Sequence, residues 1–454
     1  MGIILFILLA AAEIGLALWS RKRARGTQAW RKGRLAVRGA ELAVVLIALL
    51  LPFGQKWRLV PALIFLAVLL AIAALRWLLG RKKEDAEKKT GPVAANCVLS
   101  ILFLTLLLVP AFLFTGYDGL PVTGPHPIAQ ASAILIDRSR TDPFEQDGSF
   151  REVPVHFYFP GDADGSERYP LVVFSHGAFG YYESNTSTYM ELASHGYVVA
   201  ALDHPHHAFF ARDSAGELVL FDQGFFRDAS TTGDSNEDPE KYYALFTSWM
   251  DLRTGDMDCA VDALKAAAGS GRLDDAWALT DSDADTILAI LGCTDVTRIG
   301  LIGHSMGGAT SVALGRERSD ISAVVDLDGT MLGEYTGVED GALTVRDDPY
   351  PLPVLDFDNW ESYNDRKEYL AQGYRYPNNV LRENAAAAVY SVTVRDTRHM
   401  DFTDLPLLSP ALANSFGSGE RDKAETMTIV NGLVLGFFDH YLKGEGVFEV
   451  REIY

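Results

Sequence analysis

The sequence contains very little cysteine, and this scarcity excludes two classes of small stabilised domain. Only three of its 454 residues are Cys, and no two of them form a Cys-x-x-Cys pair. A disulfide-stabilised scaffold needs far more cysteine, and a structural zinc site needs closely spaced Cys and His ligands. At 48% hydrophobic and 22% charged, the chain is also too apolar to be disordered. Its length fits one large domain or two to three ordinary ones.

Basic residues are scarce after the first quarter of the chain. Residues 1–120 contain 16 Lys and Arg against 6 Asp and Glu, whereas the remainder contains 24 basic and 54 acidic residues. An acidic surface repels the phosphates of DNA and RNA, so no nucleic-acid partner is expected. The basic first part is also strongly hydrophobic, which indicates a membrane.

Apolar runs in the first part of the chain predict a membrane anchor. The four runs are 3–19, 42–53, 59–75 and 93–114. A helix needs about 20 mostly apolar residues to cross the hydrocarbon layer, with about 17 as a minimum. The second run reaches that length only with flanking residues. A cleaved signal peptide fits the first run less well, because its positive charges follow the apolar stretch. We therefore predict four transmembrane helices within residues 1–116.

Loop charge predicts the orientation of this anchor. Segments 21–38 and 76–89 carry eight and six Lys and Arg, respectively. Basic loops stay in the cytoplasm, and these two lie on the same side only if all four runs span the membrane. The chain after residue 116 is then expected outside the cytoplasm, in a multi-pass protein of the cell membrane. Glu13 within the first run marks either an ion pathway or, more ordinarily, a carboxylate that faces a neighbouring helix.

After a linker at 117–130, residues 131–454 have the pattern of an α/β domain. Short β-branched runs alternate with helical stretches, which is typical of a parallel sheet covered by helices on both faces. The predicted strands are 153–159, 171–175, 197–202, 298–303, 321–327, 353–357 and 389–394. The predicted helices are 186–194, 248–267, 284–291, 307–315 and 421–442. Segment 228–241 is predicted to be an exposed acidic loop. The aromatic-rich segment 208–226 is either a lid or a hydrophobic cluster beneath a loop.

One motif predicts the chemistry of this domain. Gly303-His304-Ser305-Met306-Gly307 fits G-x-S-x-G between a buried apolar strand and the start of a helix. Such a turn forces the serine into a strained backbone conformation and leaves no room for Cβ atoms at the flanking glycines. It lifts the hydroxyl above the sheet, with the N-terminus of the helix behind it to favour negative charge. Ser305 is therefore predicted to be a nucleophile.

A serine nucleophile needs a general base, which in turn is oriented by an acid. In this architecture the chain order is Ser, acid, His, and only His399 and His440 follow Ser305. His399 follows the last predicted strand, whereas His440 lies in the terminal helix, so His399 is the predicted base. Position alone leaves the acid open among residues at the ends of two successive strands, namely Asp326, Asp328, Asp356 and Asp358.

Several motifs occur in an order that resembles a known family. They are V-V-F-S-H-G and L-A-S-H-G-Y-V-V-A-A-L-D-H within 171–204, then I-G-H-S-M-G-G-A-T, D-L-D-G and R-H-M-D-F-T-D. Together they resemble the platelet-activating factor acetylhydrolase family over about 153–407. The resemblance implies an α/β-hydrolase fold with Ser305 as nucleophile, Asp328 as acid and His399 as base. It also implies an oxyanion hole formed by the backbone N–H groups of Ala178 and Met306.

The resemblance further implies an activity. A serine hydrolase of carboxylic esters is expected, acting on the short or oxidised sn-2 acyl chain of a phospholipid without a cofactor. One alternative is a carboxylesterase, lipase, polyester hydrolase or peptidase with the same triad. Another is a non-catalytic binding domain on a hydrolase scaffold.

Two groups of residues have interpretations outside the triad. Histidines 204, 206 and 207 suggest a metal site, but His residues in one loop do not supply tetrahedral geometry by themselves. We expect them to shape the mouth of the pocket, with His176 and Gly177 shaping the oxyanion turn and no metal bound. Cys259 and Cys293 fit either a disulfide in an oxidising exterior or two buried thiols.

Overall fold

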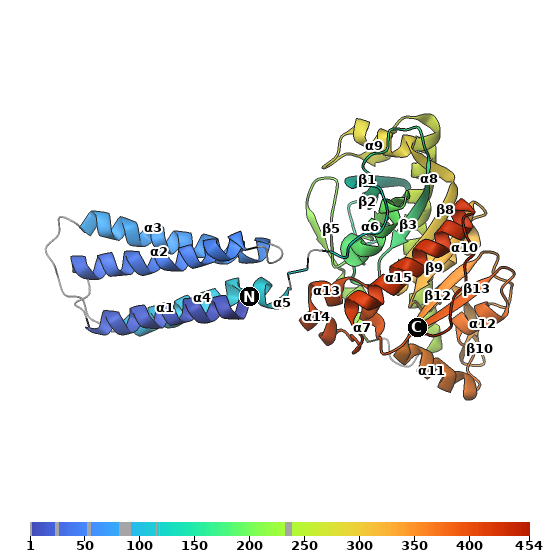
Figure 1. Ribbon diagram of the computed structural model, residues 1–454. Coiled ribbons are helices and arrows are strands. Elements are labelled where there is room, and N and C mark those ends of the chain that lie inside the picture. The colour runs from blue at the N-terminus through green and yellow to red at the C-terminus, as the bar shows by residue number, and fades with distance from the viewer. Residues whose placement is uncertain are drawn as a thin grey trace. The chain divides into compact units, whose positions relative to one another are not determined.

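The computed structural model describes residues 2–22, 27–51, 56–80, 92–114, 116–117, 119–231 and 238–454. The chain divides into two compact units (Figure 1). Unit 1 contains residues 1–119 and 407–415, and unit 2 contains residues 120–406 and 416–454. The basic segments 21–38 and 76–89 and the acidic segment 228–241 lie partly outside the described residues.

Unit 1 is built from helices. They are α1 (Gly2–Lys22), α2 (Gln28–Leu50), the 3-10 helix η1 (Lys56–Leu59), α3 (Val60–Gly80), α4 (Pro92–Leu107), α5 (Val109–Leu113) and α14 (Pro410–Ser415). α2 packs against α3 and α1 packs against α4, as Figure 1 shows.

In the described part of unit 1, two helices rather than the predicted four are long and apolar enough to cross a membrane. These are Gly2–Arg21 and Lys56–Gly80. α4 is apolar only over the shorter stretch Val93–Leu107. α2 begins at Gln28, so its first half carries charged residues and only its second half is apolar. Signal sequences and the core helices of soluble proteins share this length and composition.

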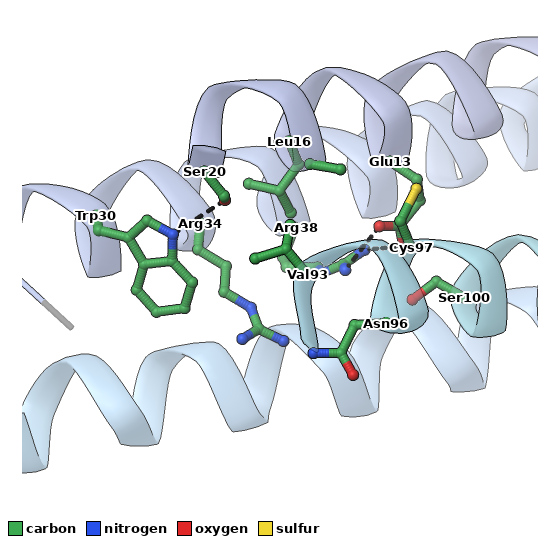
Figure 2. A pocket seen from close by; sticks show the side chains of 11 residues that line it. Glu13, Leu16, Ser20, Trp30, Arg34, Arg38, Val93, Asn96, Cys97 and Ser100 are labelled. Atoms are coloured by element: carbon green, nitrogen blue, oxygen red, sulfur yellow. Dashed lines mark hydrogen bonds and ion pairs between the residues drawn. The ribbon is translucent and has the colours of Figure 1, made fainter. Parts of the chain in front are cut away.

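A buried ion cluster joins α1 to α2. Arg38 Nη1 donates to Glu13 Oε1 at 2.5 Å and to Glu41 Oε2 at 2.6 Å, and all three side chains are shielded from solvent. Figure 2 shows Glu13 and Arg38 meeting at a small pocket that Asn96 and Ser100 of α4 also line. An unpaired charge in such an apolar bundle would be strongly destabilising. Glu13 therefore faces a neighbouring helix, which is the more ordinary of its two interpretations.

Unit 2 contains a nine-stranded sheet with the order β13-β12-β9-β8-β3-β4-β2-β1-β7. Its strands are β1 (Ile128–Thr141), β2 (Phe150–Pro160), β3 (Tyr169–Ser175), β4 (Val198–Leu202), β7 (Trp277–Ala278), β8 (Thr294–His304), β9 (Ile321–Leu327), β12 (Val354–Asn359) and β13 (Val389–Val394). From β4 to β13 all neighbours are parallel. β2 pairs antiparallel with β4 and with β1, and β1 pairs antiparallel with β7. The predicted sheet, mostly parallel, is confirmed.

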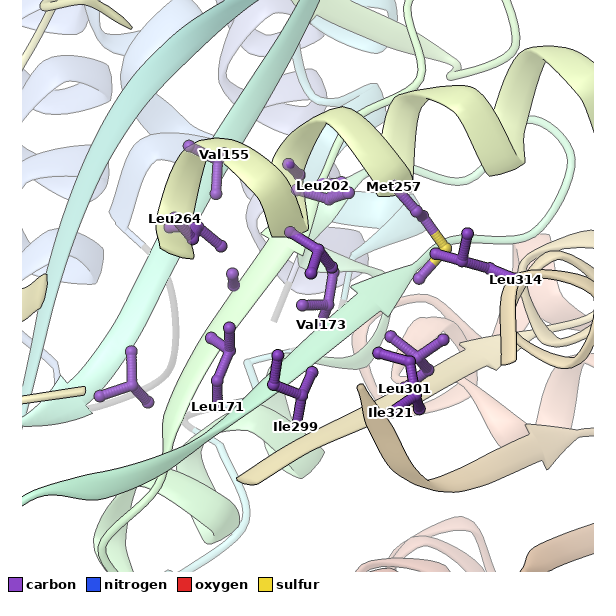
Figure 3. Packing of buried hydrophobic residues seen from close by; sticks show 14 of the residues in the cluster. Val155, Leu171, Val173, Leu202, Met257, Leu264, Ile299, Leu301, Leu314 and Ile321 are labelled. Atoms are coloured by element: carbon purple, nitrogen blue, oxygen red, sulfur yellow. The ribbon is translucent and has the colours of Figure 1, made fainter. Parts of the chain in front are cut away.

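Helices cover both faces of this sheet. One face carries α8 (Pro239–Ser270), α9 (Ala284–Gly292) and α10 (Met306–Glu317), and the other carries α6 (Thr186–Ser194) and α15 (Lys423–Phe438). On β3, Leu171 and Val173 face the first core, which Figure 3 shows, whereas Val172 and Phe174 face the second. Successive side chains of a strand point to opposite faces, so burial on both sides explains the nearly continuous apolar strands.

The sequence pattern misses β1 and the elements inserted between the main strands. β1 begins at Ile128, within the predicted linker, and its apolar residues alternate with polar ones near the edge of the sheet. The inserted elements are β5 (Phe210–Arg212), β6 (Leu218–Leu220), α7 (Gln223–Ser230), β10 (Tyr335–Glu339), β11 (Ala342–Val345), α11 (Trp360–Ala371), α12 (Pro377–Glu383) and α13 (Leu405–Leu408). In the aromatic-rich segment, Phe225 is buried in a cluster, whereas Phe209 and Phe226 are about half exposed.

The cysteines are free thiols, including Cys259 and Cys293. Burial raises the pKa of Cys259 to about 12. A thiol of that pKa is a poor nucleophile at neutral pH. Cys259 and Cys293 are therefore two separate thiols in this structure and do not form a disulfide.

Candidate active site

Ser305 lies at the sharp turn between β8 and α10. Its φ of 55° and ψ of −123° place it in a region that residues other than glycine rarely adopt. A Cβ at Gly303 would lie 2.2 Å from the backbone of Gly307, and a Cβ at Gly307 would lie 2.0 Å from the carbonyl oxygen of Ser175. The Ser305 N–H donates to the Leu327 carbonyl oxygen at 2.9 Å. This bond holds the turn beside the end of β9.

His399 is held against Asp328, the residue that follows β9. It begins the short 3-10 helix η4 (His399–Phe402) after β13, and its Nδ1 donates to Asp328 Oδ2 at 2.6 Å. Because a carboxylate only accepts, Nδ1 carries the proton and Nε2 keeps a lone pair, as a general base requires. The His399 side chain is 42% exposed and that of Asp328 is 2% exposed. The imidazole therefore faces solvent while its carboxylate partner is buried.

Asn359 gives Asp328 two further hydrogen bonds. Its backbone N–H donates to Oδ1 and its side-chain Nδ2 to Oδ2, each at 2.7 Å. Burial raises the pKa of Asp328, but the hydrogen bonds from His399 and Asn359 outweigh burial and hold that pKa below its ordinary value. The carboxylate is therefore ionised at neutral pH. No sequence motif indicated this role of Asn359, although its place at the end of β12, beside β9, is a usable signal.

Asp356 and Asp358 on β12 have a different partner. Arg382 Nε donates to Asp356 Oδ2 at 2.7 Å, and Arg382 Nη2 donates to Asp358 Oδ2 at 2.9 Å. Neither carboxylate contacts His399 in the part of the chain that the structure describes. The geometry therefore favours Asp328 as the acid.

Asp326 lies completely buried beneath the turn that carries Ser305. Its Oδ1 accepts the N–H of Gly329 at 2.9 Å and would lie 1.7 Å from a Cβ at Gly308. Burial and the nearby charges of Asp356 and Asp328 raise the pKa of Asp326 well above its ordinary value. Asp326 is thus a buried packing partner of the nucleophile helix.

Ser305 and His399 come from distant segments that meet at the same edge of the sheet. The ring centroids of His304 and His399 lie 4.7 Å apart, and His304 Nε2 donates to the His399 carbonyl oxygen at 3.1 Å. His399 thus lies beside the residue that precedes Ser305. Among the described residues no hydrogen bond joins the Ser305 hydroxyl to the His399 ring. Catalytic hydrogen bonds often tighten only when substrate is bound.

The two residues with predicted oxyanion N–H groups belong to turns that meet near Ser305. A Cβ at Gly177 would lie 3.2 Å from the Cβ of Ser305, so the turn containing Ala178 passes directly over the nucleophile. In the described chain the Ala178 N–H has no hydrogen-bond partner, and Met306 begins α10, where an N–H has no acceptor within the helix. Both N–H groups are therefore available to a substrate oxygen.

An aromatic cluster adjoins this site. It contains Phe225 of α7, three aromatic residues of α8 and Met306, and Ala178 and Phe179 pack against it. The α8 members are Tyr242, Phe246 and Trp249. The candidate oxyanion donors thus border apolar surface.

The histidines at 204–207 are engaged by protein groups. His204 Nδ1 is 2.9 Å from Asp256 Oδ2 and its Nε2 is 2.8 Å from Ser175 Oγ, while His207 Nδ1 accepts from Arg253 Nε at 3.2 Å. Burial lowers the pKa of His204 to about 4. No group of three or more potential metal ligands occurs among the described residues.

The chain matches known proteins over most of unit 2. A family model described as platelet-activating factor acetylhydrolase, isoform II, matches residues 153–449. The platelet-activating factor acetylhydrolase of Cavia porcellus is 23% identical over 290 residues, which are 61% of this chain and 58% of that protein. That of Gallus gallus is 24% identical over 298 residues, 61% of this chain and 63% of that protein. The chain thus spans about three-fifths of the length of these relatives.

A solved structure also shares the fold. A ferulic acid esterase from Streptomyces cinnamoneus superimposes with a TM-score of 0.52 at 20% identity, covering 73% of this chain and 95% of that one. At this identity the likeness concerns the fold alone, and it agrees with an α/β-hydrolase architecture.

Proposed function

The chain belongs to the platelet-activating factor acetylhydrolase, isoform II, family, and from that premise we propose that it is a serine hydrolase of carboxylic esters. The observation that carries this proposal is the 2.6 Å bond between His399 and Asp328, next to the strained turn of Ser305. The three residues follow strands in the parallel part of the sheet, and the carboxyl ends of these strands share an edge. This is where an α/β sheet presents catalytic groups.

The proposed reaction has two steps. Ser305 Oγ attacks the ester carbonyl carbon while His399 Nε2 takes the hydroxyl proton and Asp328 stabilises the resulting imidazolium. The N–H groups of Ala178 and Met306 donate to the oxyanion. The bond to the alcohol then breaks, and the imidazolium protonates the departing oxygen. In the second step His399 takes a proton from water, which attacks the carbonyl carbon of the acyl-enzyme. The bond to Ser305 Oγ then breaks, the imidazolium returns the proton to Oγ, and the acid leaves.

We propose a phospholipid with a short or oxidised sn-2 acyl chain as the substrate. The relatives named above are platelet-activating factor acetylhydrolases, which supports an acyl ester of this kind. The aromatic cluster beside Met306 supplies apolar surface next to the oxyanion donors. Its side chains are largely buried against one another, which favours a short acyl group over a long one.

We also propose that residues 1–116 anchor the protein in a membrane, with residues 117–130 as a linker and residues 131–454 as the catalytic domain outside the cytoplasm. Large apolar side chains on the outer surfaces of the unit 1 helices support the anchor. Ile7 on α1, Ile64 on α3 and Leu102 on α4 are each 59% exposed. In water such an apolar surface would be unfavourable, whereas lipid solvates it.

Replacing the nucleophile tests the proposed function. In the detergent-solubilised full chain, Ser305→Ala should lower hydrolysis of p-nitrophenyl acetate by at least about 10³-fold, because the nucleophile is lost. His440→Ala is the matched control and should keep wild-type activity, because in the described structure His440 donates to the Gly446 carbonyl oxygen at the surface and packs against Tyr441. Unchanged activity in Ser305→Ala would contradict the proposal.

A substrate panel separates the phospholipid proposal from other hydrolases. Phospholipids that differ only in sn-2 chain length should show rates that fall as the chain lengthens. Faster turnover of long chains would indicate a lipase, and cleavage of peptides alone would indicate a peptidase. Failure of a fluorophosphonate to label Ser305 would indicate a non-catalytic domain.

A further inference from the structure

Arg253 of α8 is completely buried, and its donors point at the turn that passes over Ser305. Its Nη1 donates to the His176 carbonyl oxygen at 2.5 Å and its Nη2 to the Gly177 carbonyl oxygen at 3.4 Å. Its Nε donates to His207 Nδ1 at 3.2 Å. All the side-chain nitrogens of Arg253 therefore hold this turn or the histidine beside it.

The partners of Arg253 differ from those of a buried arginine that serves stability alone. Arg151, which is equally buried, forms ion pairs with Asp142 and Asp256. Within the described residues Arg253 has no ion pair with a carboxylate, and its two closest acceptors on the turn are neutral carbonyl oxygens. The Asp256 carboxylate lies near enough to interact with the charge of Arg253, but burying a cation without a direct ion-pair partner is costly. Such a cost is expected where a side chain holds part of a functional site in position.

A second side chain holds the same carbonyl group. The backbone N–H of His204 donates to His176 Nε2 at 3.1 Å, so Nε2 is the acceptor and Nδ1 carries the proton. His176 Nδ1 then donates to the Gly177 carbonyl oxygen at 2.6 Å. The Gly177 carbonyl oxygen thus receives side-chain hydrogen bonds from Arg253 and His176, in addition to one from the backbone N–H of Gly180 at 3.0 Å.

The geometry of the peptide group links this carbonyl to the proposed oxyanion hole. The Gly177–Ala178 peptide is planar, so its C=O and N–H point in opposite directions. With the Gly177 oxygen held by Arg253, His176 and the Gly180 N–H, the Ala178 N–H points the other way, and the turn lies against Ser305. A half-turn of this peptide would put a carbonyl oxygen where the oxyanion develops and would repel it.

The following residue cannot replace Ala178 as a donor. The N–H of Phe179 already donates to the His207 carbonyl oxygen at 3.0 Å. Phe179 also has a φ of 58°, so the chain turns sharply after Ala178. The orientation of one peptide therefore decides whether the site has its second donor.

We infer that Arg253 is a positioning residue that keeps the Gly177–Ala178 peptide oriented with the Ala178 N–H toward the reacting carbonyl. The inference rests on the proposed function and deepens it. Arg253 acts through the turn and does not touch the substrate. The oriented N–H stabilises the transition state more than the bound substrate, because the negative charge on the substrate oxygen is greatest there.

Substitution of Arg253 tests the inference in the detergent-solubilised full chain. Arg253→Met should lower kcat for p-nitrophenyl acetate by about 10²-fold, with KM changed by less than about threefold, because an oxyanion donor acts in the transition state. The rate of Ser305 labelling by a fluorophosphonate should fall in parallel. Arg253→Lys should recover part of the loss, because an ammonium can still donate to one carbonyl oxygen.

Arg140 provides the matched control. Its Nη2 donates to Asp256 Oδ1 at 2.8 Å, so it belongs to the buried charge network next to Arg253 without touching the turn. Arg140→Met should destabilise the fold yet keep the wild-type kcat when measured while folded. An Arg253→Met variant that folds and keeps the wild-type kcat, or changes only KM, would overturn the inference.

His176 provides a second route if Arg253→Met does not fold. His176→Phe removes the other side-chain donor to the Gly177 carbonyl oxygen and should also lower kcat, whereas His176→Asn retains a donor near the position of Nδ1 and should lower it less. Equal, wild-type kcat in both variants would overturn the inference. If wild-type Ser305 does not react with the fluorophosphonate, the proposed function fails together with the inference. If wild type reacts and Arg253→Met reacts equally fast, only the inference fails.

Discussion

At the scale of single residues, hydrogen-bond partners distinguish carboxylates that look alike in the sequence. Asp328 bonds to His399 and Asn359, Asp356 bonds to Arg382, and Asp326 is buried with a raised pKa. Of these three carboxylates, Asp328 is the one with a lowered pKa and a hydrogen bond to an imidazole in the described structure. The choice of acid therefore depends on what surrounds each carboxyl group.

Substitution of the competing acids tests this assignment. Asp328→Asn should lower kcat for an acetate ester by about 10³–10⁴-fold, because an amide no longer holds His399 in the required tautomer or stabilises its cation. Asp356→Asn is the control and should keep kcat within a few-fold while folded, since Asp356 does not touch His399 in the described structure. A large loss of kcat in Asp356→Asn, with little loss in Asp328→Asn, would indicate that the catalytic acid is Asp356 on β12.

At the scale of elements, the site depends on close contact between the nucleophile helix and its neighbours. α10 approaches β3 so closely that Gly307 has no room for a side chain. The loop that carries His399 is joined to the start of α6, because Asn185 Nδ2 donates to the Phe402 carbonyl oxygen at 2.7 Å and Ser187 binds Asp404. Both contacts fix catalytic groups relative to the sheet.

A pair of glycine substitutions tests the contact of α10. Gly307→Ala should destabilise the protein by several kcal/mol and abolish activity, because the new Cβ would lie 2.0 Å from a backbone oxygen. Gly269→Ala in α8 meets nothing within 4 Å and should stabilise the protein by about 0.5–1 kcal/mol through helix propensity. Thermal unfolding in detergent measures both, and equal midpoints for the two variants would contradict the argument.

The Asp404 contact predicts a pH dependence of stability. Burial raises the pKa of Asp404 to about 6, despite hydrogen bonds from Ser187, whereas an unfolded chain has a value of about 4. The native state therefore binds this proton more tightly. Below pH 4 the carboxyl group is protonated in both states and has no effect. As pH rises from about 4 to 6 the free energy of unfolding falls, and above 6 the loss is complete at about 3 kcal/mol.

Asp404→Asn should remove this dependence, since an amide does not ionise. The free energy of unfolding of wild type, relative to this variant, should be lower at pH 7 than at pH 4 by about 3 kcal/mol. Denaturant unfolding in detergent at the two pH values measures the difference. A constant difference between wild type and variant would show that Asp404 keeps an ordinary pKa.

At the scale of the whole molecule, the chain joins a basic, apolar unit to an acidic α/β unit. Residues 1–120 hold 16 of the 40 basic residues but only 6 of the 60 acidic ones. Two helices in the described part of unit 1 have the length and composition of membrane spans. The proposed anchor would keep a hydrolase of lipid esters at the surface where such esters occur.

Membrane extraction tests the proposed anchor. The full chain should remain in the membrane pellet after washes with high salt and alkaline carbonate and should be released by detergent, because buried apolar helices resist both washes. A tag at the C-terminus should be accessible to protease on intact cells if unit 2 lies outside the cytoplasm. Release by carbonate alone would exclude a spanning anchor, and protection of the tag would reverse the orientation.

Local patterns in the sequence were sufficient for the regular parts of the fold. The predicted strands 321–327 and 389–394 and the helix 186–194 coincide with β9, β13 and α6, because burial on two faces or on one helical face leaves a periodic signature. The G-x-S-x-G pattern likewise locates the strained turn at Ser305, because the turn leaves no space for a Cβ at the flanking glycines. The family resemblance stated from these motifs is confirmed by the family match.

Only the tertiary structure decided what depends on residues far apart in the chain. The pairing of β1 with β2 near the edge of the sheet, the bond between Asp328 and His399, and the hold of Arg253 on the Gly177 carbonyl join segments that have no sequence signal in common. The described part of the chain also contains two helices able to span a membrane instead of the predicted four, in part because α2 starts within a basic segment. Periodicity reports burial along one element, whereas hydrogen-bond partners and pKa shifts are set by groups that folding brings together.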